Sequence, residues 1–105
     1  MNPRRVHELM RQHFPAVSAA EREWRNIAGT AVPPEALLQE LLETHIGEVE
    51  VLVEVHRKVG ALLPAKEAAA FACSHIGEGQ IQIANREFTS FVVVAQNGVA
   101  TGWRA

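Results

Sequence analysis

Residues 80–103, QIQIANREFTSFVVVAQNGVATGW, decide the fold, because they predict three β-strands in succession. Polar and apolar side chains alternate over 80–83, as they do in a strand with one buried face. The nearly continuous apolar run 88–95 is typical of a central strand covered on both faces. Asn97-Gly98 is the strongest short signal for a hairpin turn, and a last strand follows it. We therefore expect the chain to end in a three-stranded antiparallel meander.

Upstream of the meander, apolar side chains recur at helical spacing in three segments. Asn2 is suited to cap the first predicted helix, and Pro15 ends it. The second predicted helix opens on the capping box Ser18-Ala-Ala-Glu21, and Gly47 ends the third. The predicted helices cover residues 3–14, 18–29 and 34–46.

Residues 48–56, EVEVLVEVH, fit either a strand or a helix, and four valines in strict alternation favour the strand. An alanine-rich helix is predicted next, from Pro64 to Gly77. The expected fold is a single α+β domain over residues 1–105. In this fold, the N-terminal helices and one mid-chain helix pack on a small antiparallel sheet that ends in the three-stranded C-terminal meander.

The composition excludes several classes of enzyme. The chain has 105 residues, a net charge of −2 and no aspartate among its twelve acidic residues. Aspartic-protease dyads, Ser–His–Asp triads and aspartate-based calcium loops therefore lack their carboxylate. The sequence also contains no phosphate-binding loop, dinucleotide fingerprint or nucleophile-elbow motif.

Two further observations concern the cellular setting. The N-terminus lacks the apolar stretch of a signal peptide, and the single cysteine excludes an internal disulfide framework. We therefore expect a cytoplasmic protein with no membrane association. Arginine outnumbers lysine, and alanine and valine are abundant, which fits a GC-rich coding source, and we expect a bacterial protein.

The histidines and the cysteine do not have the spacing of a metal or thiol site. His7 and His13 are six residues apart, so they diverge around a helix. Cys73 and His75 are two residues apart, and such residues do not face one another on a helix. Neither H-E-x-x-H nor C-x-x-C occurs. We expect no catalytic residue, no metal and no cofactor, and an enzyme is the less favoured class.

Charge is distributed unevenly along the chain. Residues 1–30 carry five arginines and three glutamates, with Trp24 among the arginines. This mixture is able to stack bases, but the glutamates dilute its positive charge, so nucleic-acid binding is not favoured. Residues 31–60 carry six glutamates against one arginine and one lysine.

An acidic row is expected on one face of the predicted strand 48–56, where Glu48, Glu50, Glu54 and His56 alternate with the valines. A charged row of this kind commonly protects a sheet edge against pairing. It also offers a docking face for a basic protein partner, such as a nuclease, because complementary charge speeds association.

The meander has more apolar surface than one helix layer covers. Phe91, Val93 and Trp103 belong to this surface, so we expect a homodimer formed through the sheet. If the helices cover both sheet faces, a monomer is expected instead. A second possibility is a ligand pocket between sheet and helices, lined by Trp24, Phe91 and Trp103 and polarised by His56 or a glutamate.

Two classes of function remain open at this stage. The favoured class is a small non-enzymatic binding or interaction protein that self-associates, with an immunity-like or accessory role. The alternative is a small-ligand-binding domain or minimal enzyme that uses the apolar pocket. A filled interior with a surface patch favours the first class, and a closed apolar cavity with a convergent histidine or glutamate favours the second.

Overall fold

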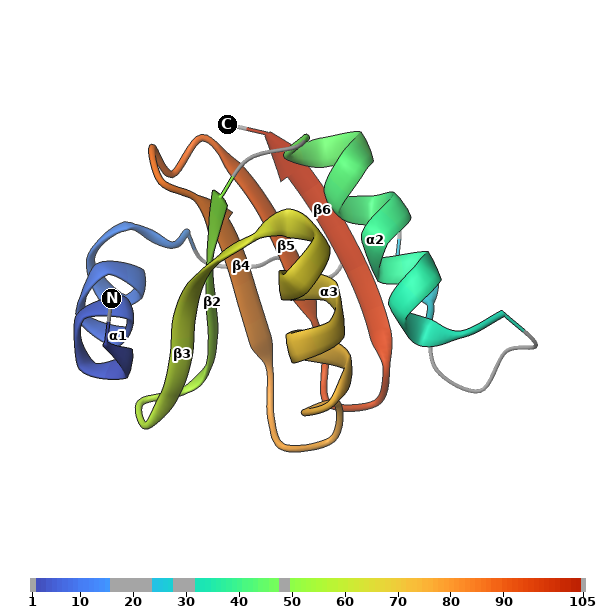
Figure 1. Ribbon diagram of the computed structural model, residues 1–105, viewed down its shortest axis with the longest axis horizontal. Coiled ribbons are helices and arrows are strands. Elements are labelled where there is room, and N and C mark those ends of the chain that lie inside the picture. The colour runs from blue at the N-terminus through green and yellow to red at the C-terminus, as the bar shows by residue number, and fades with distance from the viewer. Residues whose placement is uncertain (1, 16–23, 28–31, 48–49, 105) are drawn as a thin grey trace.

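The computed structural model describes residues 2–15, 24–27, 32–47 and 50–104 (Figure 1). These residues form three helices and a six-stranded antiparallel sheet, so the expected α+β class is confirmed. The elements, in chain order, are α1 (Pro3–His13), β1 (Arg25–Asn26), α2 (Pro34–His45), β2 (Glu50–His56), β3 (Val59–Pro64), α3 (Ala65–Cys73), β4 (Ile81–Asn85), β5 (Ser90–Val94) and β6 (Val99–Arg104).

The strands follow the order β1-β6-β5-β4-β2-β3 across the sheet. The predicted meander is confirmed, because β4 pairs with β5 and β5 pairs with β6. The strand alternative for 48–56 is also confirmed, since β2 pairs with β4 on one side and with β3 on the other. β3 was not predicted, because its sequence VGALLP contains glycine, alanine and proline, which are all depleted in strands.

The predicted helix 18–29 is wrong where the structure describes it. Arg25 and Asn26 form β1, which pairs with Ala100 and Val99 of β6. The backbone N–H of Ile27 donates to Gly98 O at 3.0 Å, and the Ile27 side chain is fully buried. A capping box and a short apolar stripe are weak local signals, and pairing with a distant strand overrides them. Residues 18–23, 28 and 29 of this prediction lie outside the described residues.

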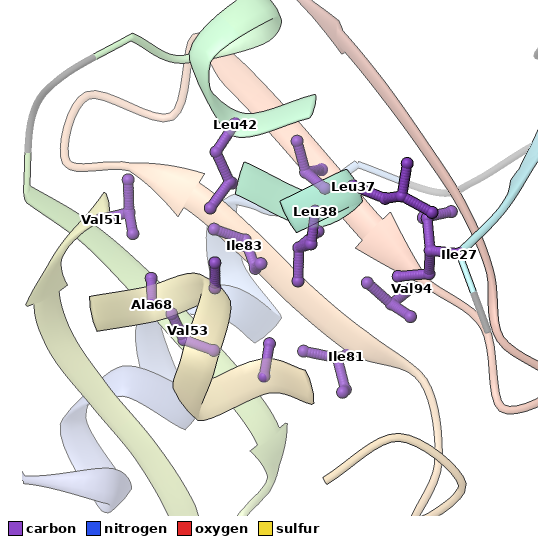
Figure 2. Close-up of a cluster of buried hydrophobic side chains, with 14 of the residues drawn as sticks. Ile27, Leu37, Leu38, Leu42, Val51, Val53, Ala68, Ile81, Ile83 and Val94 are labelled. Carbon is purple, nitrogen blue, oxygen red and sulfur yellow. The ribbon is translucent and has the colours of Figure 1, made fainter. Parts of the chain in front are cut away.

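The larger hydrophobic cluster lies between one face of the sheet and the two helices α2 and α3 (Figure 2). Leu38 and Leu42 of α2 are fully buried in it, together with Ile83 of β4. Burial of a leucine or isoleucine side chain stabilises the fold by about 1.5–3 kcal/mol. The alanines of α3, including Ala68 and Ala69, are also fully buried. This cluster therefore accounts for the alanine-rich and leucine-rich helical patterns in the sequence.

α1 packs on the opposite face of the sheet. Its N-cap Asn2 accepts a hydrogen bond from the Arg5 backbone N–H at 2.9 Å, as its sequence position predicts. Val6 and Met10 are one turn apart and point into a second hydrophobic cluster, which also contains Leu52. The sheet is therefore covered by helices on both faces.

Helices on both faces remove the reason for expecting a homodimer through the sheet. Val92 and Val94 are fully buried on the α2 and α3 side, and Phe91 and Val93 are buried on the other face. Among the described residues, the large hydrophobic side chain that is clearly exposed is Val32, at 46%. Most of the apolar surplus of the meander is thus buried within one chain, and Trp103 is partly buried.

Candidate functional site

The acidic row predicted on β2 is only partly regular in the structure. Glu50 and Glu54 lie on either side of the buried Leu52, and a register shift separates Glu54 from His56. Glu48 lies outside the described residues. β2 is an internal strand, so these charges do not protect a sheet edge, and that interpretation of the row is wrong.

α1 crosses the acidic row and divides it. His7 Nδ1 donates to Glu54 Oε2 at 2.7 Å, and the Glu54 side chain is only 12% exposed. Glu50 and His56 are exposed on either side of this contact. The His56 ring turns back on its own loop, where its Nδ1 accepts from the Lys58 backbone N–H at 3.2 Å. The row therefore does not form one continuous surface.

A second acidic surface lies on α2, and we call it the α2 face. It consists of Glu35, Glu40 and Glu43, which are all exposed. The helix contains no lysine or arginine. The excess of glutamate over residues 31–60 is the sequence signal for these residues. The predicted acidic site lies on β2 instead, because it rests on the alternation of 48–56.

The α2 face keeps most of its negative charge. Glu40 forms one salt bridge, with Arg25 of β1 at 3.0 Å, and both side chains are exposed. Gln39 donates to Glu43 at 3.3 Å, which fixes the carboxylate without neutralising it. Within the described part of the chain, Glu35 forms no salt bridge. The face is thus a solvated, largely uncompensated acidic surface.

Two of the predicted pocket residues, Phe91 and Trp103, belong to a cluster of aromatic rings. Phe91 and Trp103 lie opposite one another on β5 and β6, with ring centroids 5.4 Å apart. Phe14, just after α1, packs edge-on against both rings, at 5.2 and 6.0 Å. Val93 is fully buried beside them in β5, and Trp24 is half-buried just before β1. Sequence reasoning missed Phe14, because its role depends on how α1 crosses the sheet.

The structure also has an open polar depression of about 320 Å³ on α1. Glu8, Arg11 and Gln12 line it, and none of the predicted pocket residues contributes to it. It therefore differs in place and in chemistry from the apolar pocket expected for a small ligand.

The thiol of Cys73 is not poised as a nucleophile. Burial, together with the nearby negative charge of Glu35, raises its pKa to about 11. The thiol is therefore protonated at neutral pH, whereas a reactive cysteine needs its thiolate. His75, the nearest histidine in sequence, instead contacts Glu78 Oε2 at 2.8 Å.

The pKa of His45 depends on the position of this residue at the end of α2. Burial and the positive charge of Arg104 lower its pKa below the ordinary value. Arg104 is held there because its Nε donates to the His45 carbonyl at 2.8 Å, which caps the helix. Across the described residues, no group of three or more histidine, cysteine or glutamate side chains is arranged to hold a metal.

Comparison with known proteins gives no information about function, so the functional proposal rests on the structure. The chain matches no family model, no curated protein and no solved structure. None of the helices in the described ranges has both the length and the apolar character needed to cross a membrane.

Proposed function

We propose that this chain is a small non-enzymatic binding protein that docks a basic protein partner through the α2 face. The observation that carries the proposal is the negative charge of that face, of which the salt bridge between Glu40 and Arg25 compensates only a part. Its three glutamates are exposed, and the helix has no basic side chain besides His45. Acidic surfaces of this kind steer a basic partner into place and raise its association rate.

The Cys73 thiol and the aromatic cluster also support the proposal. The Cys73 thiol is protonated at neutral pH, and the rings of Phe91 and Trp103, two of the predicted pocket residues, both pack against Phe14. These two observations favour a binding surface over catalysis. An immunity-like or accessory role in the bacterial cytoplasm fits such a surface, with the chain covering the basic substrate-binding face of a nuclease.

The test is affinity capture from a lysate of the native host, followed by mass spectrometry. The variant Glu35→Gln/Glu40→Gln/Glu43→Gln removes the charge of the α2 face and keeps the shape of its side chains. The matched control Glu8→Gln/Glu78→Gln/Glu87→Gln makes the same change in net charge elsewhere. We expect the wild type and the control to retain a basic protein at low salt, and the α2 variant to lose it.

The captured protein is then purified, and its association rate is measured at rising salt. We expect the rate to fall with salt for the wild type and to depend much less on salt for the α2 variant. Equal loss of binding in both triple variants would show a general effect of net charge. It would contradict the proposal that the partner docks on the α2 face. The row predicted on β2 is tested in parallel with Glu50→Gln, for which we expect unchanged capture.

A further inference from the structure

β3 forms a long open edge of the sheet. Among the described strands it is the last in the sheet order and pairs with β2 alone, whereas β1 at the opposite edge has two residues. β3 spans Val59–Pro64, and its outward backbone groups have no strand partner within the described residues. α1 packs over the face of this strand through Val6, which lies against Gly60. An edge of this length is a template for a further strand.

The sequence of β3 lacks the usual protection against pairing. Natural edge strands carry a lysine, a central proline or an inward charge that blocks another chain. β3 reads VGALLP, with no charged residue, and its proline is the final residue. Leu62 and Leu63 are only partly buried by their own chain, so a further strand would cover more of their surface.

We propose that β3 pairs antiparallel with β3 of a second copy, giving one continuous sheet across a twofold axis. In an antiparallel pair, residues directly opposite one another point to the same face. The twofold axis therefore runs perpendicular to the sheet and passes beside a residue that meets its own copy. Ala61 or Leu62, at the centre of β3, is that residue. This pairing places both copies of α1 on one face of the joint sheet.

The charges at the two ends of β3 complement one another in this arrangement. Arg57 and Lys58 form the turn before β3, and both side chains are exposed without a salt bridge in the described part of the chain. Antiparallel alignment brings this turn to the far end of β3 in the second copy. There, Glu50 is the β2 partner of Pro64, and Glu67 lies in the first turn of α3. The twofold axis produces this basic-to-acidic contact twice, which favours a second copy as the occupant.

The test is the mass of the purified full chain, measured by size-exclusion chromatography with light scattering over a range of concentrations. We expect a dimer that dissociates on dilution. Ala61→Lys places a charge in the open edge and is expected to give a monomer. Ala36→Lys is the matched control, because Ala36 is exposed on α2, and this variant is expected to stay dimeric. Circular dichroism of each variant confirms that it is folded.

A charge exchange tests the arrangement itself. Lys58→Glu and Glu50→Lys are each expected to weaken the dimer, because each places like charges together. The double variant is expected to restore it. A wild type that stays monomeric at every concentration overturns the proposal. A dimer that persists in Ala61→Lys shows a different interface and also overturns it.

Cross-linking then locates the axis in a Cys73→Ser background. Ala61→Cys or Leu62→Cys is expected to form an intermolecular disulfide on mild oxidation, and Ala36→Cys is not. Cross-linking equal to that of Ala36→Cys at both positions contradicts the twofold pairing. The proposal is independent of the α2 face, because none of the residues changed at the edge belongs to that face.

Discussion

The imidazole ring of His45, at the end of α2, lies directly against Gly102 of β6. A Cβ atom at Gly102 would lie 2.5 Å from His45 Cδ2 and 2.8 Å from Cγ. This glycine is therefore required by the close approach of a helix to the sheet rather than by a turn. Arg104, two residues later, fixes the same helix end by donating to the carbonyls of Thr44 and His45. Together these contacts position α2, and hence the α2 face, on the sheet.

Gly102→Ala is expected to lower the free energy of unfolding by about 1–3 kcal/mol, because the new methyl group overlaps the His45 ring. The measurement is urea denaturation followed by circular dichroism. In a His45→Ala background the methyl group has room, so we expect most of this loss to disappear. An equal loss in both backgrounds would show that the ring is not the cause.

The hydrogen bond from His7 to Glu54 is expected to hold α1 on the sheet. His7→Ala leaves a mostly buried carboxylate without its partner, which costs about 1–3 kcal/mol of stability. Gln12→Ala changes an exposed residue of the same helix, and we expect an effect within about 0.5 kcal/mol. Adding Glu54→Gln to His7→Ala should recover part of the loss, because an unpaired amide costs less to bury than a charge. No recovery would argue against this account of the contact.

Phe88 is expected to report backbone strain in the β4–β5 turn. Its φ of 55° lies in the left-handed region, which costs a residue with a side chain about 1–2 kcal/mol. Phe88→Gly and Phe88→Ala both remove the ring, which packs on His13 with centroids 5.2 Å apart. The glycine variant should nevertheless be the more stable of the two, by about 1 kcal/mol in thermal or urea unfolding. An alanine variant of equal or greater stability would mean that the turn relaxes to another conformation.

Alkylation of Cys73 tests the electrostatics at the α2–α3 contact. Iodoacetamide reacts with the thiolate, so we expect the rate to rise with a midpoint near the pKa of about 11. Glu35→Gln removes the second cause of the raised pKa, and the midpoint should therefore move down. It should stay above 9.0, the ordinary value for a thiol, because burial is the larger cause. Glu87→Gln, in the β4–β5 turn, is the control and should leave the midpoint unchanged.

Local sequence patterns predict those elements that are stabilised by residues nearby in the sequence. The valine alternation of 50–56, the turn at Asn97-Gly98 and the N-cap Asn2 each have a local cause, and each prediction is confirmed. β1 and β3 depend on pairing with distant strands, and neither has a strong strand composition. They could not be predicted, because the partner rather than the segment decides their conformation.

The candidate site shows the same division. The period of a strand predicts that Glu50 and Glu54 share a face, whereas a register shift between Glu54 and His56 interrupts this period. That α1 lies across this face and engages Glu54 is a tertiary contact between residues 47 positions apart. Nothing in the spacing of His7 signals it. The docking role of these residues stays a prediction, and the contact with α1 is the part of their surroundings that the sequence does not indicate.

The two edge strands of the sheet differ in length, and this difference limits how many copies can join by strand addition. Polymerisation by strand addition needs two open edge strands on every molecule, so that each added subunit offers a free edge to the next subunit. Among the described residues, β1 offers two residues and β3 offers six, so a molecule whose β3 is paired keeps only the short edge of β1 for another copy. In the proposed pairing, association through β3 therefore closes at two subunits, and we expect the chain to resist extension into fibres.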